Sequence, residues 1–130
     1  MWAAGGDHLD VVKWLLGERS ASDVPCVPDP PLDPNVGNKE GRTALMWACK
    51  TAAERTVAYL LSLPTVDPTL TMKNGSSAFD WAVFGGAIPV MELVAASPRV
   101  DIAARNLAGC SAIMWASSAG CVSICCTLVY

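Results

Sequence analysis

Apolar residues recur along the chain in short clusters whose spacing, i, i+3 and i+4, fits one face of a short α-helix. Each of three such clusters follows a hydroxyl residue, whose oxygen can accept a hydrogen bond from a free backbone N–H at a helix start. The clusters are Leu45, Ala48 and Cys49 after Thr43; Phe79, Ala82 and Val83 after Ser77; and Ile113, Ala116 and Ser117 after Ser111. The pattern predicts three short helices with similar starts.

A second apolar cluster follows each of the first ones and predicts a partner helix. These clusters are Val57, Leu60 and Leu61; Val90, Leu93 and Val94; and Ile124, Leu128 and Val129. Pro89 falls in the first turn of the middle helix, where a missing N–H costs little. Because Leu60-Leu61 matches Leu93-Val94 one residue early, we expect a looser register in the second helices.

A Trp-Ala pair marks the same point of each helix pair and sets the period of the chain. The pairs are Trp2-Ala3, Trp47-Ala48, Trp81-Ala82 and Trp115-Ala116, and the last two spacings between them are equal. A glycine stands two positions before each of the three hydroxyl residues, at Gly41, Gly75 and Gly109. Equal spacings of this length indicate stacked copies of one small unit, which offer an extended binding surface rather than one deep cleft.

We expect the chain to form one domain, 1–130. The period divides this domain into four units at about 1–17, 33–66, 67–100 and 101–130. We expect the first and last units to be incomplete, because the first lacks its turn and the last stops inside its second helix. The first Trp-Ala spacing is longer than the others because of a proline-rich insertion at 17–32. Pro25, Pro28, Pro31 and Pro34 stand at every third position, as in a ligand of SH3 or WW domains, but without an adjacent basic cluster a surface loop is favoured.

These units resemble the ankyrin repeat, a turn plus two helices in about 33 residues. The segment Gly41-Arg42-Thr43-Ala44-Leu45-Met46-Trp47-Ala48 is similar to the front half of that repeat, and residues 3–16 are similar to its back half. The resemblance implies an all-α fold, a right-handed α-solenoid of helix-turn-helix repeats. Alanines replace the proline of the family signature, at Ala44, Ala78 and Ala112, and its histidine is replaced by Met1, Met46, Asp80 and Met114. We therefore expect a less rigid stack than a consensus array.

The resemblance also implies that a partner protein meets the turns and the outward positions of the first helices. This surface changes from charged to apolar along the array. Carried onto this chain, the predicted partner-binding residues are Lys39, Glu40, Arg42, Lys50, Thr51, Lys73, Asn74, Ser76, Phe84, Leu107 and Ala108.

The tryptophans have two interpretations. Next to a buried alanine, they are expected to pack between neighbouring units as an internal ladder. The alternative is an aromatic stripe open to the groove, because tryptophan is common at binding hot spots. We favour packing.

Charge argues against nucleic-acid binding, and the pattern of polar residues argues against a membrane span. The net charge is −3 and the nine basic residues are scattered along the sequence, whereas nucleic-acid binding needs clustered Lys and Arg. Residues 106–130 carry no charge, but polar residues and Gly109 and Gly120 interrupt the apolar run, so we expect no membrane span.

The six cysteines are expected to be small buried hydrophobes in a reducing compartment, the cytoplasm or the nucleus. Cys121 and Cys125 share one helical face and suggest a metal or redox site instead. They supply two ligands where a structural zinc needs four, so we expect no metal and no cofactor.

Catalysis has little support in the sequence. His8 is the single histidine, and we expect it to have a structural role at a helix start. No nucleophile, phosphate loop or carboxylate pair appears in a catalytic pattern. We therefore predict a non-enzymatic protein-interaction module or scaffold, monomeric or part of a longer array. The alternative is a regulatory or targeting segment of a larger enzyme, such as a kinase or ubiquitin ligase.

Overall fold

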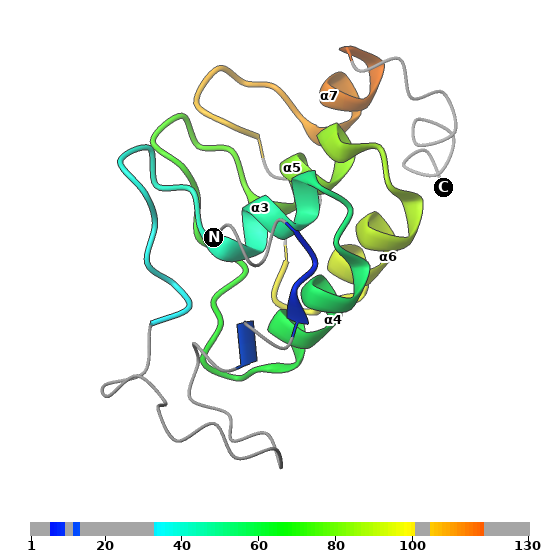
Figure 1. The fold of residues 1–130 in the computed structure, drawn as a ribbon. Coiled ribbons are helices and arrows are strands. Elements are labelled where there is room, and N and C mark those ends of the chain that lie inside the picture. Colours follow the sequence, from blue (N-terminus) through cyan, green and yellow to red (C-terminus); the bar gives the residue numbers. More distant parts are fainter. Residues whose placement is uncertain (1–5, 10–11, 14–32, 101–104, 119–130) are drawn as a thin grey trace, which may run out of the picture.

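The computed structural model describes residues 6–9, 12–13, 33–100 and 105–118, and within these ranges the helices form two rows. α3, α5 and α7 make up the first row and α4 and α6 the second, as Figure 1 shows. The bounds are α3 Ala44–Lys50, α4 Glu54–Ser62, α5 Ala78–Gly85, α6 Ile88–Ala96 and α7 Ala112–Ser118. Strand pairing in the described ranges is confined to one isolated bridge, between Thr71 and Ser77. The predicted all-α stack of helix-turn-helix units is confirmed.

The helices recur at a constant spacing along the chain, which we call the repeat interval. The first-row helices begin at Ala44, Ala78 and Ala112, and the second-row helices begin at Glu54 and Ile88. Both rows therefore keep the same interval, and the expected one-residue offset in the second helices was wrong.

The buried positions of the second helices show why. Val57 and Leu60 of α4 are buried, and so are Met91 and Val94 of α6, each one repeat interval later, whereas Leu93 is half-buried. Leu93 and Val94 are both strongly apolar, so hydropathy alone does not tell which of them faces the core.

Side-chain oxygens start α3 and α5 as predicted. The Thr43 hydroxyl accepts a hydrogen bond from the Met46 N–H, and the Ser77 hydroxyl accepts one from the Asp80 N–H, both at 3.4 Å. Asp80 returns the contact, because its Oδ2 accepts from the Ser77 N–H at 3.0 Å and completes a capping box. The residue that replaces the family's histidine in this unit thus braces the helix start by another route.

The turns before the first helices project to one side (Figure 1). Main-chain hydrogen bonds join each described turn to the next. The Lys73 N–H donates to the Glu40 carbonyl at 3.0 Å, and the Leu107 N–H donates to the Asn74 carbonyl at 2.9 Å. Each turn contains a glycine in the left-handed region, which residues with a Cβ rarely adopt. These are Gly41, Gly75 and Gly109, with φ of 83°, 80° and 77°.

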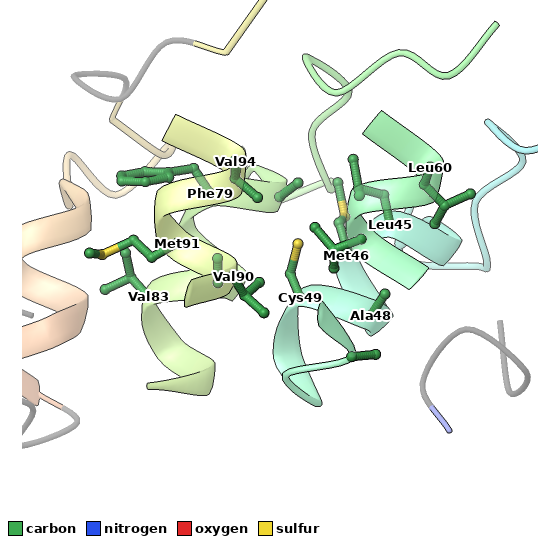
Figure 2. Packing of buried hydrophobic residues seen from close by; sticks show 14 of the residues in the cluster. Leu45, Met46, Ala48, Cys49, Leu60, Phe79, Val83, Val90, Met91 and Val94 are labelled. Atoms are coloured by element: carbon green, nitrogen blue, oxygen red, sulfur yellow. The ribbon is translucent and has the colours of Figure 1, made fainter. Parts of the chain in front are cut away.

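The core lies between the two rows and runs the length of the described stack. Side chains of the α3–α4 pair face those of the α5–α6 pair in Figure 2. The buried faces predicted for the first helices are confirmed in α3 and α5, and Met46 and Ala78 widen them. Ser117 was placed wrongly on the buried face of α7, since this polar residue is exposed.

Side chains from neighbouring units complete both ends of α4. Its N-cap residue, Ala53, offers no side-chain hydrogen bond, and the Asp7 carboxylate accepts instead from the Thr56 N–H at 3.1 Å and the Thr56 hydroxyl at 2.8 Å. Near its C-terminus, the Arg99 guanidinium donates to the Val66 carbonyl at 2.7 Å and the Leu61 carbonyl at 3.3 Å. The units therefore satisfy one another's polar groups as well as sharing a core.

The C-terminal ends of α3 and α5 approach so closely that Gly85 has no room for a side chain. A Cβ at this position would lie 2.7 Å from the Lys50 carbonyl oxygen and 2.8 Å from that of Cys49. These are backbone atoms, so relief requires the helices to separate.

We predict that Gly85→Ala lowers the free energy of unfolding by about 1–3 kcal/mol, because overpacking forces a backbone shift. Urea unfolding followed by circular dichroism measures the change. Unchanged stability would show that α3 and α5 are not held this close.

Ala52 adopts a left-handed conformation that suits glycine. Its φ is 59°, and the residue one repeat interval later, Gly86, has φ 73° and ends α5 as a C-cap. The left-handed conformation of an alanine costs the folded state about 1–2 kcal/mol. Replacement by glycine removes this strain, but it also raises the conformational entropy of the unfolded chain, which cancels part of the gain. Ala52 is exposed, so no packing opposes its replacement.

We predict that Ala52→Gly raises the free energy of unfolding by about 0.5–1 kcal/mol. The same urea titration measures the change in the free energy of unfolding, which should be opposite in sign to that of Gly85→Ala. A loss of stability would contradict the assigned backbone conformation.

Candidate functional site

Two tryptophans and two cations from neighbouring units meet on the first-helix row. Trp47 of α3 and Trp81 of α5 occupy the same position of successive units and are both half-buried. The Arg42 guanidinium carbon lies 4.8 Å from the Trp47 ring centroid and 4.4 Å from that of Trp81. The Lys50 Nζ lies 5.2 Å and 5.5 Å from the same two centroids. All four distances allow cation–π attraction, so each cation bridges two units. We call these four residues the cation–tryptophan cluster.

The cluster corrects two expectations from the sequence. Basic residues that are scattered along the chain are brought together by the fold. Trp47 and Trp81 lie at the edge of the core, not within it, although Trp81 packs against the buried cluster. Each of the two tryptophans therefore fits both interpretations in part, because the residue is half-buried and its ring also lies under a cation.

The positive charges of the cluster have no acidic partner in the part of the chain that the structure describes. Within the described ranges no carboxylate pairs with Arg42 or Lys50, and the buried Nε of Arg42 has no hydrogen-bond partner. A guanidinium offers five N–H donors. A carboxylate can accept two hydrogen bonds from these donors, whereas the face of an aromatic ring does not replace such hydrogen bonds. The cluster is therefore a site at which an anionic group can add hydrogen bonds.

A small, partly open hollow lies beside the cluster. Among the described residues, Ser76, Asp80, Trp81 and Phe84 line it. The rings of Trp81 and Phe84 meet edge to face at 5.8 Å and 74°, and the Trp81 indole N–H points to the Met72 sulfur at 3.0 Å. Phe84 remains 45 % exposed. The hollow thus has aromatic walls and one exposed apolar edge.

Asp80 places a carboxyl group in the wall of the hollow. Burial raises the pKa of this carboxyl above its usual value of 3.8, and the hydrogen bonds from Ser77 oppose the shift. A raised folded-state pKa means that the folded protein binds this proton more tightly than the unfolded chain does. The resulting stability is present below about pH 3.8 and is lost as the pH rises through the folded-state pKa.

We predict that Asp80→Asn, which keeps an acceptor for the Ser77 N–H, removes this dependence. The free energy of unfolding of the wild type minus that of the variant should fall as the pH rises from about 3 to about 7. Urea titrations at several pH values measure this difference, in which the other titrating groups cancel. A difference that rises with pH would contradict the direction of the shift.

The predicted partner-binding residues fall into three groups by exposure. Arg42 and Lys50 are half-buried within the cation–tryptophan cluster. Ser76 is buried, with 2 % of the residue exposed, so it offers a partner little contact surface. The exposed residues are Lys39, Glu40, Thr51, Lys73, Asn74, Phe84, Leu107 and Ala108.

Trp47 and Trp81 were not among the predicted partner-binding residues, because packing was favoured over a groove-facing stripe. One signal was available, because Lys50 follows Trp47 by three positions and so shares its helix face. The contact of Arg42 with Trp81, which belongs to the next unit, has no local signal.

The remaining candidates for chemistry are the cysteines and possible metal ligands, and in the described part of the chain they form no metal site. Burial raises the pKa of the Cys49 thiol to about 12, so it stays protonated and behaves as a small hydrophobe, as predicted. No group of three His, Cys, Asp or Glu side chains is placed to hold a metal ion in the described ranges, and no helix there is long and apolar enough to cross a membrane. Cys121 and Cys125, which were weighed as an alternative metal or redox site, and the insertion at 17–32 lie outside the described residues.

Comparisons with known proteins agree with the repeat fold. A family model described as ankyrin repeats, three copies, matches residues 1–106. The fold is similar to that of a chain in the crystal structure of the yeast ribosomal protein Rps3 in complex with its chaperone Yar1. That match has a TM-score of 0.78 and 23 % sequence identity, and covers 97 % of this chain and 85 % of the other. No curated protein matches the sequence.

Proposed function

The chain belongs to the ankyrin-repeat family, whose repeats serve as protein-interaction modules, and we propose that it binds a partner protein through its turns and first-helix row. The observation that carries the proposal is the cation–tryptophan cluster, whose two positive charges have no acidic partner among the described residues and lie near an exposed Phe84. Aromatic and arginine side chains together are the residue types most enriched at binding hot spots.

The turns support the same proposal. Their main chains are fixed by the hydrogen bonds between neighbouring turns, whereas the side chains of Lys39, Lys73 and Leu107 are exposed at one repeat position. A rigid main chain with free side chains costs little entropy to order on binding. These side chains differ from unit to unit, and because they are exposed, core packing does not restrict which residue stands there.

The proposal assigns the module no catalytic role. His8 is exposed, and its carbonyl accepts a hydrogen bond from the Val12 N–H at 3.0 Å, which fits a place at a helix start. The neighbouring Asp7 carboxylate is engaged with Thr56 and is therefore not held on the imidazole. The buried thiol of Cys49 suits a reducing compartment, and we propose the cytoplasm or the nucleus.

Selection of a displayed random-peptide library on the immobilised protein tests the proposal. We expect enriched peptides whose binding falls at least about tenfold in the triple variant Lys39→Ala/Arg42→Ala/Lys73→Ala. The matched control is Arg55→Ala/Glu92→Ala, at exposed positions of α4 and α6. Circular dichroism verifies that both variants are folded.

The control variant should keep full binding. Failure to enrich any peptide above the bare support would contradict the proposed function. Binding that the second-row control abolishes and the triple variant leaves intact would move the binding surface to the other side of the stack.

A further inference from the structure

We propose that the bound partner segment is acidic and apolar in sequence: a carboxylate side chain lies against Arg42 and Lys50, and an adjoining apolar side chain enters the hollow beside Phe84. The inference deepens the proposed function and rests on it. It adds the chemical class of the partner and the direction in which the segment lies.

The charge of the first-helix row is opposite to that of the whole chain. The protein carries a net charge of −3, yet the second and third units present four cations on their turns and first helices. Within residues 38–50 and 72–85, which hold these cations, the acidic residues are Glu40 and Asp80, and Asp80 is 4 % exposed. Asp33 and Asp67 precede these two segments. Such a local field attracts an acidic segment and disfavours a basic one. The four cations are Lys39, Arg42, Lys50 and Lys73.

The two cations of the cluster are ordered before any partner arrives. Each lies within 5.5 Å of two indole rings, which restrict its side chain and exclude water from one side. The entropy that a long basic side chain usually loses on binding has therefore already been lost in part. A carboxylate fits the planar donors of Arg42 and adds the partner that the described carboxylates do not provide.

Repeat positions show where the apolar side chain goes. Phe84 stands one repeat interval after Lys50, and Ser76 stands one repeat interval after Arg42. The short Ser76 side chain leaves the space beside Trp81 and Phe84 open, whereas Arg42 extends across the tryptophans one unit earlier. The same two positions are thus cationic in the second unit and apolar or small in the third.

The hollow itself disfavours a second carboxylate. Asp80 lines it, and two carboxylates at close range repel each other. On the turns, Lys73 gives way to Leu107, which is 80 % exposed, one repeat interval later. The segment therefore lies along the first-helix row with its acidic residue over α3 and its apolar residue over α5.

Fluorescence polarisation with labelled synthetic peptides tests this inference. The probe has a core of alternating Glu and Leu between Gly-Ser flanks, and the matched probes have Gln-Leu, Lys-Leu and Glu-Gly cores. We expect the Glu-Leu core to bind at least about tenfold more tightly than the Gln-Leu core, and the preference to weaken with added salt. The Lys-Leu core should not bind.

Protein variants assign the preference to the two subsites. Arg42→Gln/Lys50→Gln should remove the preference for Glu over Gln, whereas the matched variant Arg55→Gln on α4 should keep it. Phe84→Ser should instead remove the preference of the Glu-Leu core over the Glu-Gly core. Circular dichroism confirms that each variant is folded.

Several outcomes would overturn the inference. They are equal binding of the Glu-Leu and Gln-Leu cores, no binding of either, and loss of the preference in Arg55→Gln. Tighter binding of a phosphoserine peptide or of a thymidine oligonucleotide than of the Glu-Leu core would also overturn it, in favour of phosphate recognition. Library peptides that bind the same surface without acidic residues would leave the proposed function intact and remove only this inference.

Discussion

The register between neighbouring turns is the constraint on which the rest of the structure depends. Main-chain hydrogen bonds from Lys73 to Glu40 and from Leu107 to Asn74 hold successive turns in line. At the other end of the first helices, the missing side chain of Gly85 lets α5 approach the last carbonyls of α3. With both ends fixed, α3 and α5 pack side by side one repeat interval apart, and the two rows of described helices share one core.

The candidate site is a direct consequence of that register. Arg42 belongs to one unit and Trp81 to the next, and they meet because α5, which carries Trp81, packs against α3, which carries Trp47. A shift of one residue would turn α5 by about 100° and carry the indole away from the guanidinium. The same alignment places Phe84 one repeat interval after Lys50. The first-helix row is therefore cationic at α3 and apolar at α5, and this difference can orient a bound segment. Recognition and folding thus share one geometric requirement.

The sequence predicted most of the fold because the repeat multiplies each weak signal. One hydroxyl before an apolar cluster is ambiguous, but Thr43 and Ser77 in the same frame identified two caps that the structure confirms. Local patterns failed where the outcome depends on a neighbouring unit. Hydropathy did not separate Leu93 from Val94, because contact with α4 decides which of them is buried. Ser76 was placed on the surface because the turn position is exposed in general, whereas here its side chain is covered. The pairing of Arg42 with Trp81 was beyond sequence reasoning, since it joins residues of different units through side-chain length and rotamer.

A double-mutant cycle between Arg42 and Trp81 tests most directly whether the register builds this surface. Urea unfolding of the wild type, Arg42→Gln, Trp81→Leu and the double variant yields the coupling free energy of the pair. The account predicts a favourable coupling of about 0.5–1 kcal/mol, the strength of a partly exposed cation–π contact. Additive effects, with a coupling indistinguishable from zero, would show that the two side chains do not interact across the units and would contradict the account.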